Sequence, residues 1–193
     1  MTGELKVMKV FRYIGYLVMF IKKGWQRIIW GNIQKSMMVG CGKNVKLANG
    51  CDLTYSHLHI GNNVYLGPFT FVISPFADVY IGNNIMFGPN VMIISGDHRI
   101  DIIGKYMMDV PEQASGSDKD VIIEDDVWVG ANVIILKGVN IGRGSVIGAG
   151  SIVTKSILPY TIYVGEPSKK CWERFDSETI IKHEHLIKKN RNI

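Results

Sequence analysis

Residues 123–153 read IEDDVWVGANVIILKGVNIGRGSVIGAGSIV, and an aliphatic residue recurs at every sixth position of this stretch. The recurring residues are Ile123, Val129, Ile135, Ile141, Ile147 and Val153. Glycine directly follows them at positions 130, 142 and 148. A period of six matches neither the turn of a helix nor the alternation of an ordinary strand. The stretch therefore indicates a repeat architecture.

The same frame continues upstream of this stretch. Inward-type residues recur there as Ile60, Leu66, Val72, Ile81, Phe87 and Ile93. One coil spans 18 residues from Ile123 to Ile141 and 21 residues from Ile60 to Ile81, but the step from Ile81 to Ile123 is 42 residues. About 21 to 24 residues therefore leave the repeat as a loop between Ser95 and Asp120.

A short strand followed by a tight corner explains this period. The aliphatic residue points inward, and we expect the glycine to permit the bend at each corner. Three such units make one coil of a triangular prism, and stacked coils bury a continuous aliphatic column. We predict a mainly β fold, a single-stranded parallel β-helix, whose loop at about 97–120 carries the function because insertions in solenoids collect on one side.

Composition and charge exclude several classes of protein. The 193 residues are 47% apolar and 20% charged, which excludes collagen, coiled coil and disordered chain. The net charge of +5 divides into +8 over residues 1–46, −6 over residues 47–167 and +3 over residues 168–193. An acidic middle between basic ends argues against nucleic-acid binding and favours local anion sites at the ends.

Cysteine usage and the first apolar segment indicate a cytoplasmic protein. Cys41, Cys51 and Cys171 form no C-x-x-C pair, and their odd number suits a reducing compartment. The apolar run at residues 14–21 is shorter than the roughly 20 residues that span a bilayer. Lys22-Lys23-Gly24-Trp25 follows it, where a signal peptide has small residues.

We divide the chain into three parts: an N-terminal amphipathic helical segment at residues 1–36, the β-helix with its projecting loop at residues 37–165, and a C-terminal extension at residues 166–193. Residues 5–30 place apolar and basic side chains on different faces of a helix. We favour a cap on the open end of the solenoid, which prevents end-to-end strand pairing. An interfacial helix, bound peripherally to anionic lipid at the inner face of the membrane, is the alternative.

The sequence of the C-terminal extension predicts a short helix. It spans residues 176–190, and Asp176 or Ser177 is suited to be its N-cap.

Three stretches carry a family resemblance: VWVGANV at residues 127–133, IGAGSIVTK at residues 147–155 and VGEPSK at residues 164–169. Together they resemble the bacterial hexapeptide-repeat acetyltransferases over about residues 39–175. The resemblance implies a left-handed β-helix and acetyl-CoA as the co-substrate, with no metal expected.

Two further features narrow the resemblance. GDHRID at residues 96–101 is similar to the N-H-R-M-D stretch of the xenobiotic and streptogramin acetyltransferases. The N-terminal layout and the ending from Glu173 to Glu184 look more like the acetyltransferases of capsule, lipopolysaccharide and exopolysaccharide clusters.

By this resemblance, His98 is the general base that takes the proton of an acceptor hydroxyl or amino group as that group attacks the thioester. Imidazole suits the task because its unperturbed pKa is about 6.5. No acyl-enzyme is required, so no cysteine is assigned as a nucleophile. Asp101 is expected to orient His98 or to hold an acceptor hydroxyl.

The resemblance also implies where coenzyme A binds, between adjacent subunits of a homotrimer. The expected residues are Trp128 beside the thioester, Ala131 and Ala149 along the pantetheine arm, Thr154 and Lys155 at its outer end, and Lys169 with Lys170 or Arg174 at phosphate. A prism with a projecting loop can complete its cleft only against a neighbour, which also favours the trimer.

The acceptor is expected to be a saccharide. Gly67-Pro68-Phe69 and Ser74-Pro75-Phe76 stand where galactoside and maltose acetyltransferases have polar residues that contact sugar, so a simple galactoside fits poorly. A xenobiotic acceptor, such as an antibiotic hydroxyl, is the alternative within the family.

Two other classes remain open. A zinc enzyme of the carbonic-anhydrase type needs three converging histidines. The chain has His57, His59 and His98, but His57 and His59 lack that family's spacing. A non-catalytic β-helix scaffold is the other.

Overall fold

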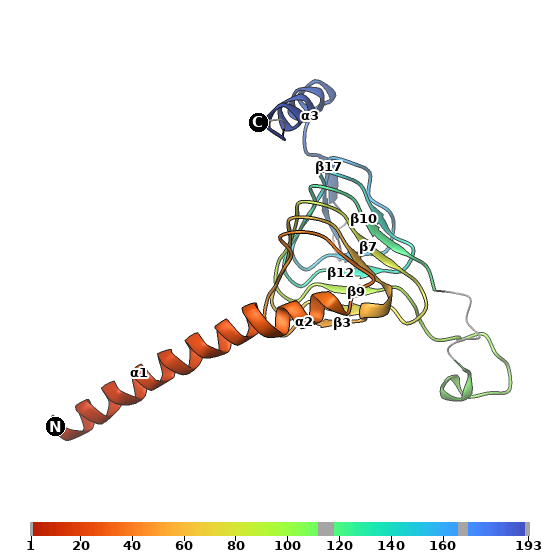
Figure 1. Ribbon diagram of the computed structural model, residues 1–193. Helices are drawn as coiled ribbons and strands as arrows, with labels where there is room; N and C mark the ends of the chain where they lie inside the picture. The colour runs from red at the N-terminus through yellow and green to blue at the C-terminus, as the bar shows by residue number, and fades with distance from the viewer. Residues whose placement is uncertain (1, 112–117, 166–169, 192–193) are drawn as a thin grey trace.

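The computed structural model is a triangular coil of three parallel sheets (Figure 1). It describes residues 2–111, 118–165 and 170–191. Sheet 1 contains β1 (Gly40–Cys41), β4 (Leu58–Ile60), β7 (Val79–Ile81), β10 (Val121–Ile123) and β13 (Asn140–Ile141). Sheet 2 contains β2 (Lys46–Leu47), β5 (Val64–Leu66), β8 (Ile85–Phe87), β11 (Trp128–Val129), β14 (Val146–Ile147), β16 (Thr161–Val164) and β17 (Lys170–Glu173). Sheet 3 contains β3 (Asp52–Leu53), β6 (Phe71–Ile73), β9 (Met92–Ile94), β12 (Ile134–Leu136) and β15 (Ile152–Val153).

The hexad prediction is confirmed by register and burial. Ile81 pairs with Ile123, and Ile123 pairs with Ile141, so equivalent hexad positions stack along the axis. The six aliphatic residues of the deciding stretch are each 1% exposed or less. The 42-residue step is absorbed outside the coil because Val79 still pairs with Val121.

The hexad glycines do not serve the role expected of them. The backbone turns at other residues, such as Asn63, Asn84 and Asn132, whose φ angles lie between 56° and 58°. A Cβ atom on Gly61 would lie 2.6 Å from the carbonyl oxygen of Gly82 in the next coil. These glycines are therefore needed for close stacking of coils rather than for the bend.

Asparagine ladders support one edge of the coil. The amide of Asn62 donates to Asn83 Oδ1 at 3.0 Å, and the amide of Asn83 donates to Asp125 Oδ1 at 3.0 Å. Each rung provides hydrogen bonds to polar groups of the neighbouring coil. These bonds lower the free-energy cost of a corner, where backbone groups have no strand partner.

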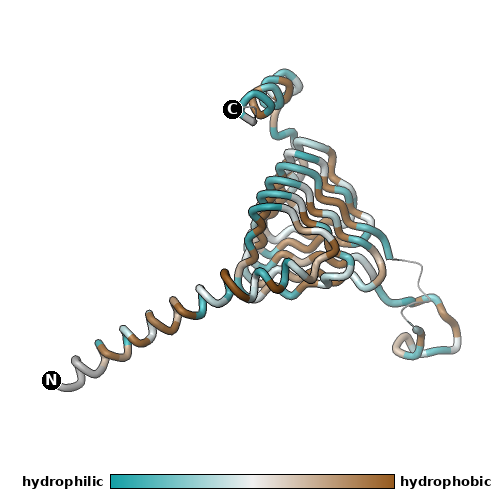
Figure 2. The backbone as a smooth tube through the Cα atoms, in the orientation of Figure 1, coloured by the Kyte–Doolittle hydropathy of each residue, from teal (hydrophilic) through white to brown (hydrophobic). Residues whose placement is uncertain are grey.

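The N-terminal end corrects the cap prediction. Helix α1 (Thr2–Trp25) continues through the π-helix η1 (Gln26–Trp30) into α2 (Gly31–Ser36). Only the last of these covers the coil: Gln34 is buried, and its amide donates to Tyr55 Oη at 3.0 Å. Figure 2 shows α1 extending away from the coil with apolar residues along its length. Residues 31–36 therefore form the cap, whereas most of the residues from 8 to 30 whose exposure is described stay exposed.

In the described part of the chain, none of the helices combines the length and the hydropathy that a bilayer span requires. The remaining helices are the 3-10 turns η2 (Tyr55–His57) and η3 (Met107–Asp109) and the helix α3 (Ser177–Arg191). The predicted N-cap is confirmed, since Thr179 N donates to Asp176 Oδ1 at 2.7 Å.

Three contacts dock the C-terminal segment at the edge between sheets 1 and 2. The hydroxyl of Tyr160 donates to Glu184 of α3, and the ring of Tyr160 lies near those of Phe175 and His183. Strand β17 pairs antiparallel with β16 and is the edge strand of sheet 2. The C-terminal helix and the loop leave the coil at different corners of the prism (Figure 1).

Candidate active site

His98 lies just after β9, where the chain leaves sheet 3. A pocket of about 320 Å³ opens there, lined by Ile73, Pro75, Phe76, Ile94, Gly96, Asp97, His98 and Asp118. His98 is exposed, so its imidazole is accessible to an acceptor. The pocket is lined both by residues of the coil and by residues of the loop in which the sequence predicts the function.

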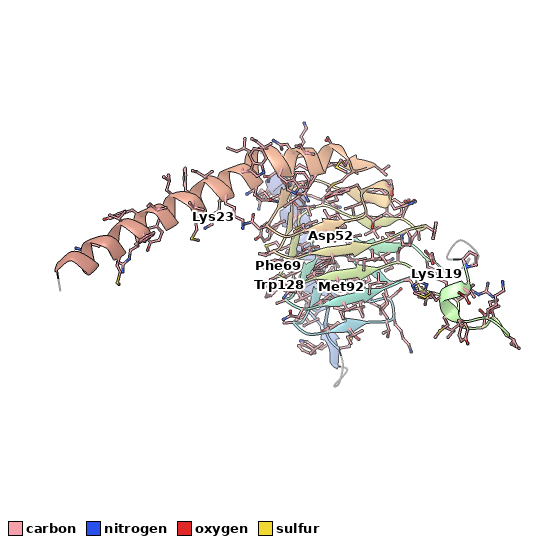
Figure 3. The ribbon with its side chains drawn as sticks, turned by 90° about the horizontal axis from the view of Figure 1, so that it is seen from below. Lys23, Asp52, Phe69, Met92, Lys119 and Trp128 are labelled. Carbon is pink, nitrogen blue, oxygen red and sulfur yellow. The ribbon has the colours of Figure 1, made fainter. Side chains whose placement is uncertain are left out.

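Short contacts fix the start of the loop. Buried Ser95 donates from its backbone to Ile73 O at 3.0 Å, and its hydroxyl donates to Ser74 Oγ at 2.7 Å. The returning strand of the loop is held by Lys119 N, which donates to Ser95 O at 2.9 Å. Figure 3 labels Lys119 where the loop rejoins the coil. His98 therefore stands only three residues from a rigid anchor.

Ion pairs flank His98 on both sides. Lys137 Nζ lies 2.6 Å from Asp97 Oδ2. Arg99 donates from Nε to Asp101 Oδ1 at 2.5 Å and from Nη2 to Asp101 Oδ2 at 2.6 Å. The Arg99 hydrogen bonds lower the pKa of Asp101. Asp101 is thus held by Arg99, and any contact that it makes with an acceptor is shared with that guanidinium.

The pocket beside His98 has an apolar wall. Ile73, Pro75 and Phe76 form it, and the side chains of Ile73 and Phe76 are exposed. The segment Ser74-Pro75-Phe76 therefore borders the candidate site, as the sequence suggested. Phe69 lies at another edge, between β5 and β6, with a φ of 57° and 54% of its surface exposed.

The residues expected to bind coenzyme A divide between two edges of the prism. Trp128 points outward from sheet 2 and is 52% exposed. Ala131 and Ala149 stack at the next corner, where Gly150 N donates to Ala131 O. Thr154 and Lys155 follow β15 and line a second pocket of about 310 Å³. Trp128 lies on sheet 2 and His98 follows sheet 3, so a single protomer does not bring the two side chains together. Figure 3 shows Phe69 and Trp128 on the same side of the coil.

The expected phosphate-binding end is described only in part. Lys169 lies outside the described residues, and Lys170 begins β17. Arg174 Nη1 donates to Gly144 O at 2.8 Å and to Asp126 Oδ2 at 3.2 Å, and its guanidinium stacks on Phe175. Arg174 therefore fastens the C-terminal segment to the coil, a role that the sequence did not indicate.

The histidines of the zinc alternative have another partner. His57 Nδ1 lies 3.1 Å from Asp78 Oδ1, and His59 Nε2 lies 3.5 Å from the same oxygen. Among the residues that the structure describes, no three His, Cys, Asp or Glu side chains are grouped to hold a metal ion.

Sequence reasoning missed two residues at the site. Lys137 follows β12, whose Leu136 pairs with Ile94, so the hexad frame already placed it above the start of the loop. Asp118 lines the pocket from the returning end of the loop, which has no repeat register and gave no signal.

Known proteins that resemble this chain are hexapeptide-repeat proteins and acetyltransferases. A family model described as the hexapeptide repeat of succinyl-transferase matches residues 120–155. A chloramphenicol acetyltransferase of Morganella morganii is 41% identical over 80 residues, which are 39% of this chain and 38% of that protein. The chain therefore spans well under half the length of this curated relative.

Solved structures match a longer stretch. A galactoside acetyltransferase in complex with coenzyme A is 27% identical with a TM-score of 0.58, covering 77% of this chain and 72% of that one. A maltose O-acetyltransferase from Clostridium difficile 630 is 31% identical with a TM-score of 0.65, covering 76% of this chain and 75% of that one. An identity of this size across three quarters of both chains, on the same stacked coil, shows that the chain belongs to the hexapeptide-repeat acetyltransferase family.

Proposed function

We propose that the protein is an acetyltransferase that moves the acetyl group of acetyl-CoA to a hydroxyl or amino group, with His98 as the general base. The observation that carries this proposal is the position of His98, exposed at a pocket of about 320 Å³ whose base is fixed by the coil. The galactoside acetyltransferase that resembles this chain was solved with coenzyme A, which supports the choice of donor.

The reaction is a direct transfer. His98 takes the acceptor proton while the acceptor oxygen or nitrogen forms a bond to the thioester carbon. The carbon–sulfur bond then breaks, and the leaving thiolate of coenzyme A takes that proton from the imidazolium. Burial raises the pKa of Cys41 and of Cys51, which disfavours these two thiols as nucleophiles.

The acceptor that we propose is a saccharide of capsule, lipopolysaccharide or exopolysaccharide biosynthesis. The wall of Ile73, Pro75 and Phe76 favours one that carries an apolar part, such as a deoxy sugar or a lipid-linked glycan. The same wall gives specific support to a second candidate, the hydroxyl of a xenobiotic such as an antibiotic. Both candidates use His98 in the same way.

We propose that the working form is a homotrimer of left-handed coils. Tyr65, Met86 and Trp128 form an exposed apolar ladder on sheet 2, because Tyr65 pairs with Met86 and Met86 with Trp128. A cyclic trimer joins two different faces of neighbouring protomers, so sheet 2 of one would meet the sheet 3 edge of the next. That arrangement brings Trp128 of one protomer toward His98 of its neighbour.

The cleft between protomers would then hold coenzyme A. Ala131 and Ala149 leave room for the pantetheine arm, and Thr154 and Lys155 border its outer end. Lys169 and Lys170 remain our candidates for phosphate, whereas Arg174 is engaged within the chain.

We propose a cytoplasmic location, with residues 5–30 lying peripherally on the inner face of the membrane. The helix α1 is exposed along the part whose side chains are described, and residues 5–46 contain no acidic residue. Both features favour an anionic lipid surface.

Two measurements test the proposed function. Calorimetry with acetyl-CoA should detect binding that weakens with the 3′-dephospho form. Absence of binding at millimolar concentration would favour a non-catalytic β-helix scaffold.

Release of free thiol from acetyl-CoA should then be measured with deoxy-sugar glycosides, sugars of capsule and lipopolysaccharide, and chloramphenicol. His98→Ala should lower this rate about 100-fold or more while binding of acetyl-CoA persists, whereas the exposed His185 on α3 gives a matched control, His185→Ala, with little effect. Equal rates for the two variants would exclude His98 as the base.

A further inference from the structure

A second cavity lies where the N-terminal helices meet the coil. Its volume is about 300 Å³, and it is lined by Lys23, Gln26, Gly31, Lys35, Val45, Lys46, Leu47, Asn49 and Tyr65. Figure 3 shows Lys23 on the side of the coil that carries Trp128. The cavity contains none of the residues that are expected to bind coenzyme A, so the donor does not account for it.

The charged residues that line this cavity are all lysines. They come from three elements: Lys23 from α1, Lys35 from α2 and Lys46 from β2. Lys35 Nζ donates to Asn32 Oδ1 at 3.4 Å, which leaves its charge uncompensated. Among the described residues, none of the three ammonium groups forms an ion pair with a carboxylate. Like charges gathered without a counter-charge repel one another, so the cavity favours a bound anion.

The cavity lies on the side of α1 opposite to its apolar face. Lys23 is two residues from both Ile21 and Trp25, and residues two apart point to nearly opposite sides of a helix. Ile21 and Trp25 are exposed. The face of α1 that we propose to lie on a membrane is therefore turned away from the lysines, and the anion that binds them comes from the aqueous side.

Sheet 2 connects this cavity to the cleft that we propose between protomers. Lys46 pairs with Tyr65, so it continues the exposed ladder of Tyr65, Met86 and Trp128 by one strand. Strands β2 and β17 are the two edges of sheet 2. Lys46 on β2 and Lys170 on β17, our candidate for the donor phosphate, therefore stand at opposite ends of the sheet. A donor that enters at the β17 edge leaves the β2 edge to the acceptor.

The coil places the cavity within reach of His98 of a neighbouring protomer. Met86 on β8 and His98 after β9 belong to the same coil. A threefold axis parallel to the coils keeps each residue at its own height, so the neighbour's His98 would stand level with Met86. Lys46 lies two strand spacings from Met86, about 10 Å along the coil. A short saccharide can span this distance, with its reacting group at His98 and an anionic group at the lysines.

The two ends of this span differ in charge. Two carboxylates, those of Asp97 and Asp118, line the pocket of His98, and Lys137 pairs with the first of them. Only lysines carry charge in the second cavity. The contrast gives the acceptor a direction, because a negative group is more stable at the lysines than beside the reacting hydroxyl.

We propose that the acceptor is an anionic saccharide and that Lys23, Lys35 and Lys46 of one protomer bind its carboxylate or phosphate group while the neighbour's His98 faces the group that is acetylated. The proposal rests on the acetyltransferase function and the trimer proposed above, and it adds the charge of the acceptor. Asn49 and Tyr65 add an amide and a hydroxyl that donate to the same anionic oxygens.

Matched charged and neutral sugars test the site by calorimetry on the full-length protein. Digalacturonic acid is compared with galactobiose, glucose 1-phosphate with methyl glucoside, and inorganic phosphate is the probe without a sugar. We expect at least one charged sugar to bind about tenfold or more tightly than its neutral counterpart, and Lys35→Gln/Lys46→Gln to remove that difference. The control Lys188→Gln/Lys189→Gln removes the same charge from exposed positions on α3 and should leave the difference unchanged.

Three results of this titration would overturn the proposal. The first is equal binding of charged and neutral sugars, and the second is no binding of either charged sugar at millimolar concentration. The third is inorganic phosphate that binds as tightly as glucose 1-phosphate, since the cavity would then recognise an anion without its sugar.

Binding of acetyl-CoA separates this proposal from the proposed function. Lys35→Gln/Lys46→Gln should bind acetyl-CoA as the wild type does, and weaker binding would mean that the lysines hold the donor phosphate and that the acceptor proposal is wrong. If the wild type binds a charged sugar but not acetyl-CoA, the acetyltransferase function is wrong and the lysine cavity remains a saccharide site.

Mixed trimers test whether the lysines and His98 of one cleft come from different chains. When His98→Ala and Lys35→Gln/Lys46→Gln chains are co-expressed, the lysines of the first can meet His98 of the second in an intact cleft. Mixed trimers should therefore release thiol with the charged sugar faster than trimers of Lys35→Gln/Lys46→Gln alone. If the lysines serve His98 of their own chain, dilution with His98→Ala chains would slow the reaction, and the arrangement across protomers would be wrong.

Discussion

Lys137 Nζ lies 2.6 Å from Asp97 Oδ2 and so ties the residue before His98 to the next coil of the prism. Partly exposed ion pairs contribute up to about 1 kcal/mol, which corresponds to about fivefold in a rate. We expect Lys137→Met to lower kcat by up to about that factor while KM for acetyl-CoA changes little. On the proposed mechanism the substitution loosens the orientation of His98, the proposed base, and leaves the proposed donor site intact. Steady-state kinetics check this, and an effect confined to KM would show that Lys137 contacts the donor instead.

The hexad glycines should resist substitution for a reason unrelated to turning. In Gly61→Ala the new Cβ would lie 2.6 Å from the backbone oxygen of Gly82, which cannot move away without separating two coils. We expect a loss of about 1–3 kcal/mol in the free energy of unfolding, measured by urea denaturation. Gly15→Ala is the control, since nothing lies within 4 Å of its Cβ position, and it should be neutral or slightly stabilising.

Phe69 occupies a corner position that its side chain type disfavours. Its φ of 57° is left-handed and lies close to the φ of 56° of Asn90 and Asn132 at the same edge. Left-handed backbone costs a residue with a Cβ about 1–2 kcal/mol, and asparagine tolerates it better. We expect Phe69→Asn to raise the midpoint of thermal unfolding and Asn90→Phe to lower it. A lower midpoint for Phe69→Asn would mean that the aromatic ring is needed for packing against Gly50 or a neighbouring protomer.

The docking of α3 should weaken at alkaline pH. Burial, followed by the hydrogen bond to Glu184, raises the pKa of Tyr160 from 10.0 to about 12. The folded state therefore holds the phenol proton more tightly than the unfolded state. This contribution to stability is complete below pH 10 and is lost as the pH rises toward 12. Unfolding followed at several pH values should show a decline over this window that is smaller in Tyr160→Phe; identical slopes would contradict the assignment.

The coil itself could be predicted from sequence because one physical requirement recurs in every turn. Each of Ile123, Val129 and Ile135 must fill the same kind of interior position, so the requirement appears as a period that a reader can count. The glycines follow the same period, but their pattern has two possible explanations. A tight bend and the close stacking of two coils both favour a residue without a side chain. Only the register of Gly61 against Gly82 distinguishes them.

The site was predictable where it borders the repeat and not where it leaves it. His98 follows β9 closely, and its motif resembles a known loop. Asp118 reaches the pocket only after the chain has left the coil and returned, and no local pattern encodes that path. The cap was misassigned because residues 5–30 have a clear amphipathic pattern, whereas α2 covers the coil through one buried amide, Gln34, which no periodicity reveals.

The loop departs after Ile94 and returns at Val121 with the register between β7 and β10 intact. The pairing of the two coils therefore does not depend on the number of residues in the loop between them. We expect such a loop to be exchangeable between relatives as a unit. Grafting residues 97–117 from a relative should change the choice of acceptor, measured by thiol release with a panel of acceptors, while the melting temperature of the coil is kept. The architecture separates the evolution of specificity from the evolution of folding.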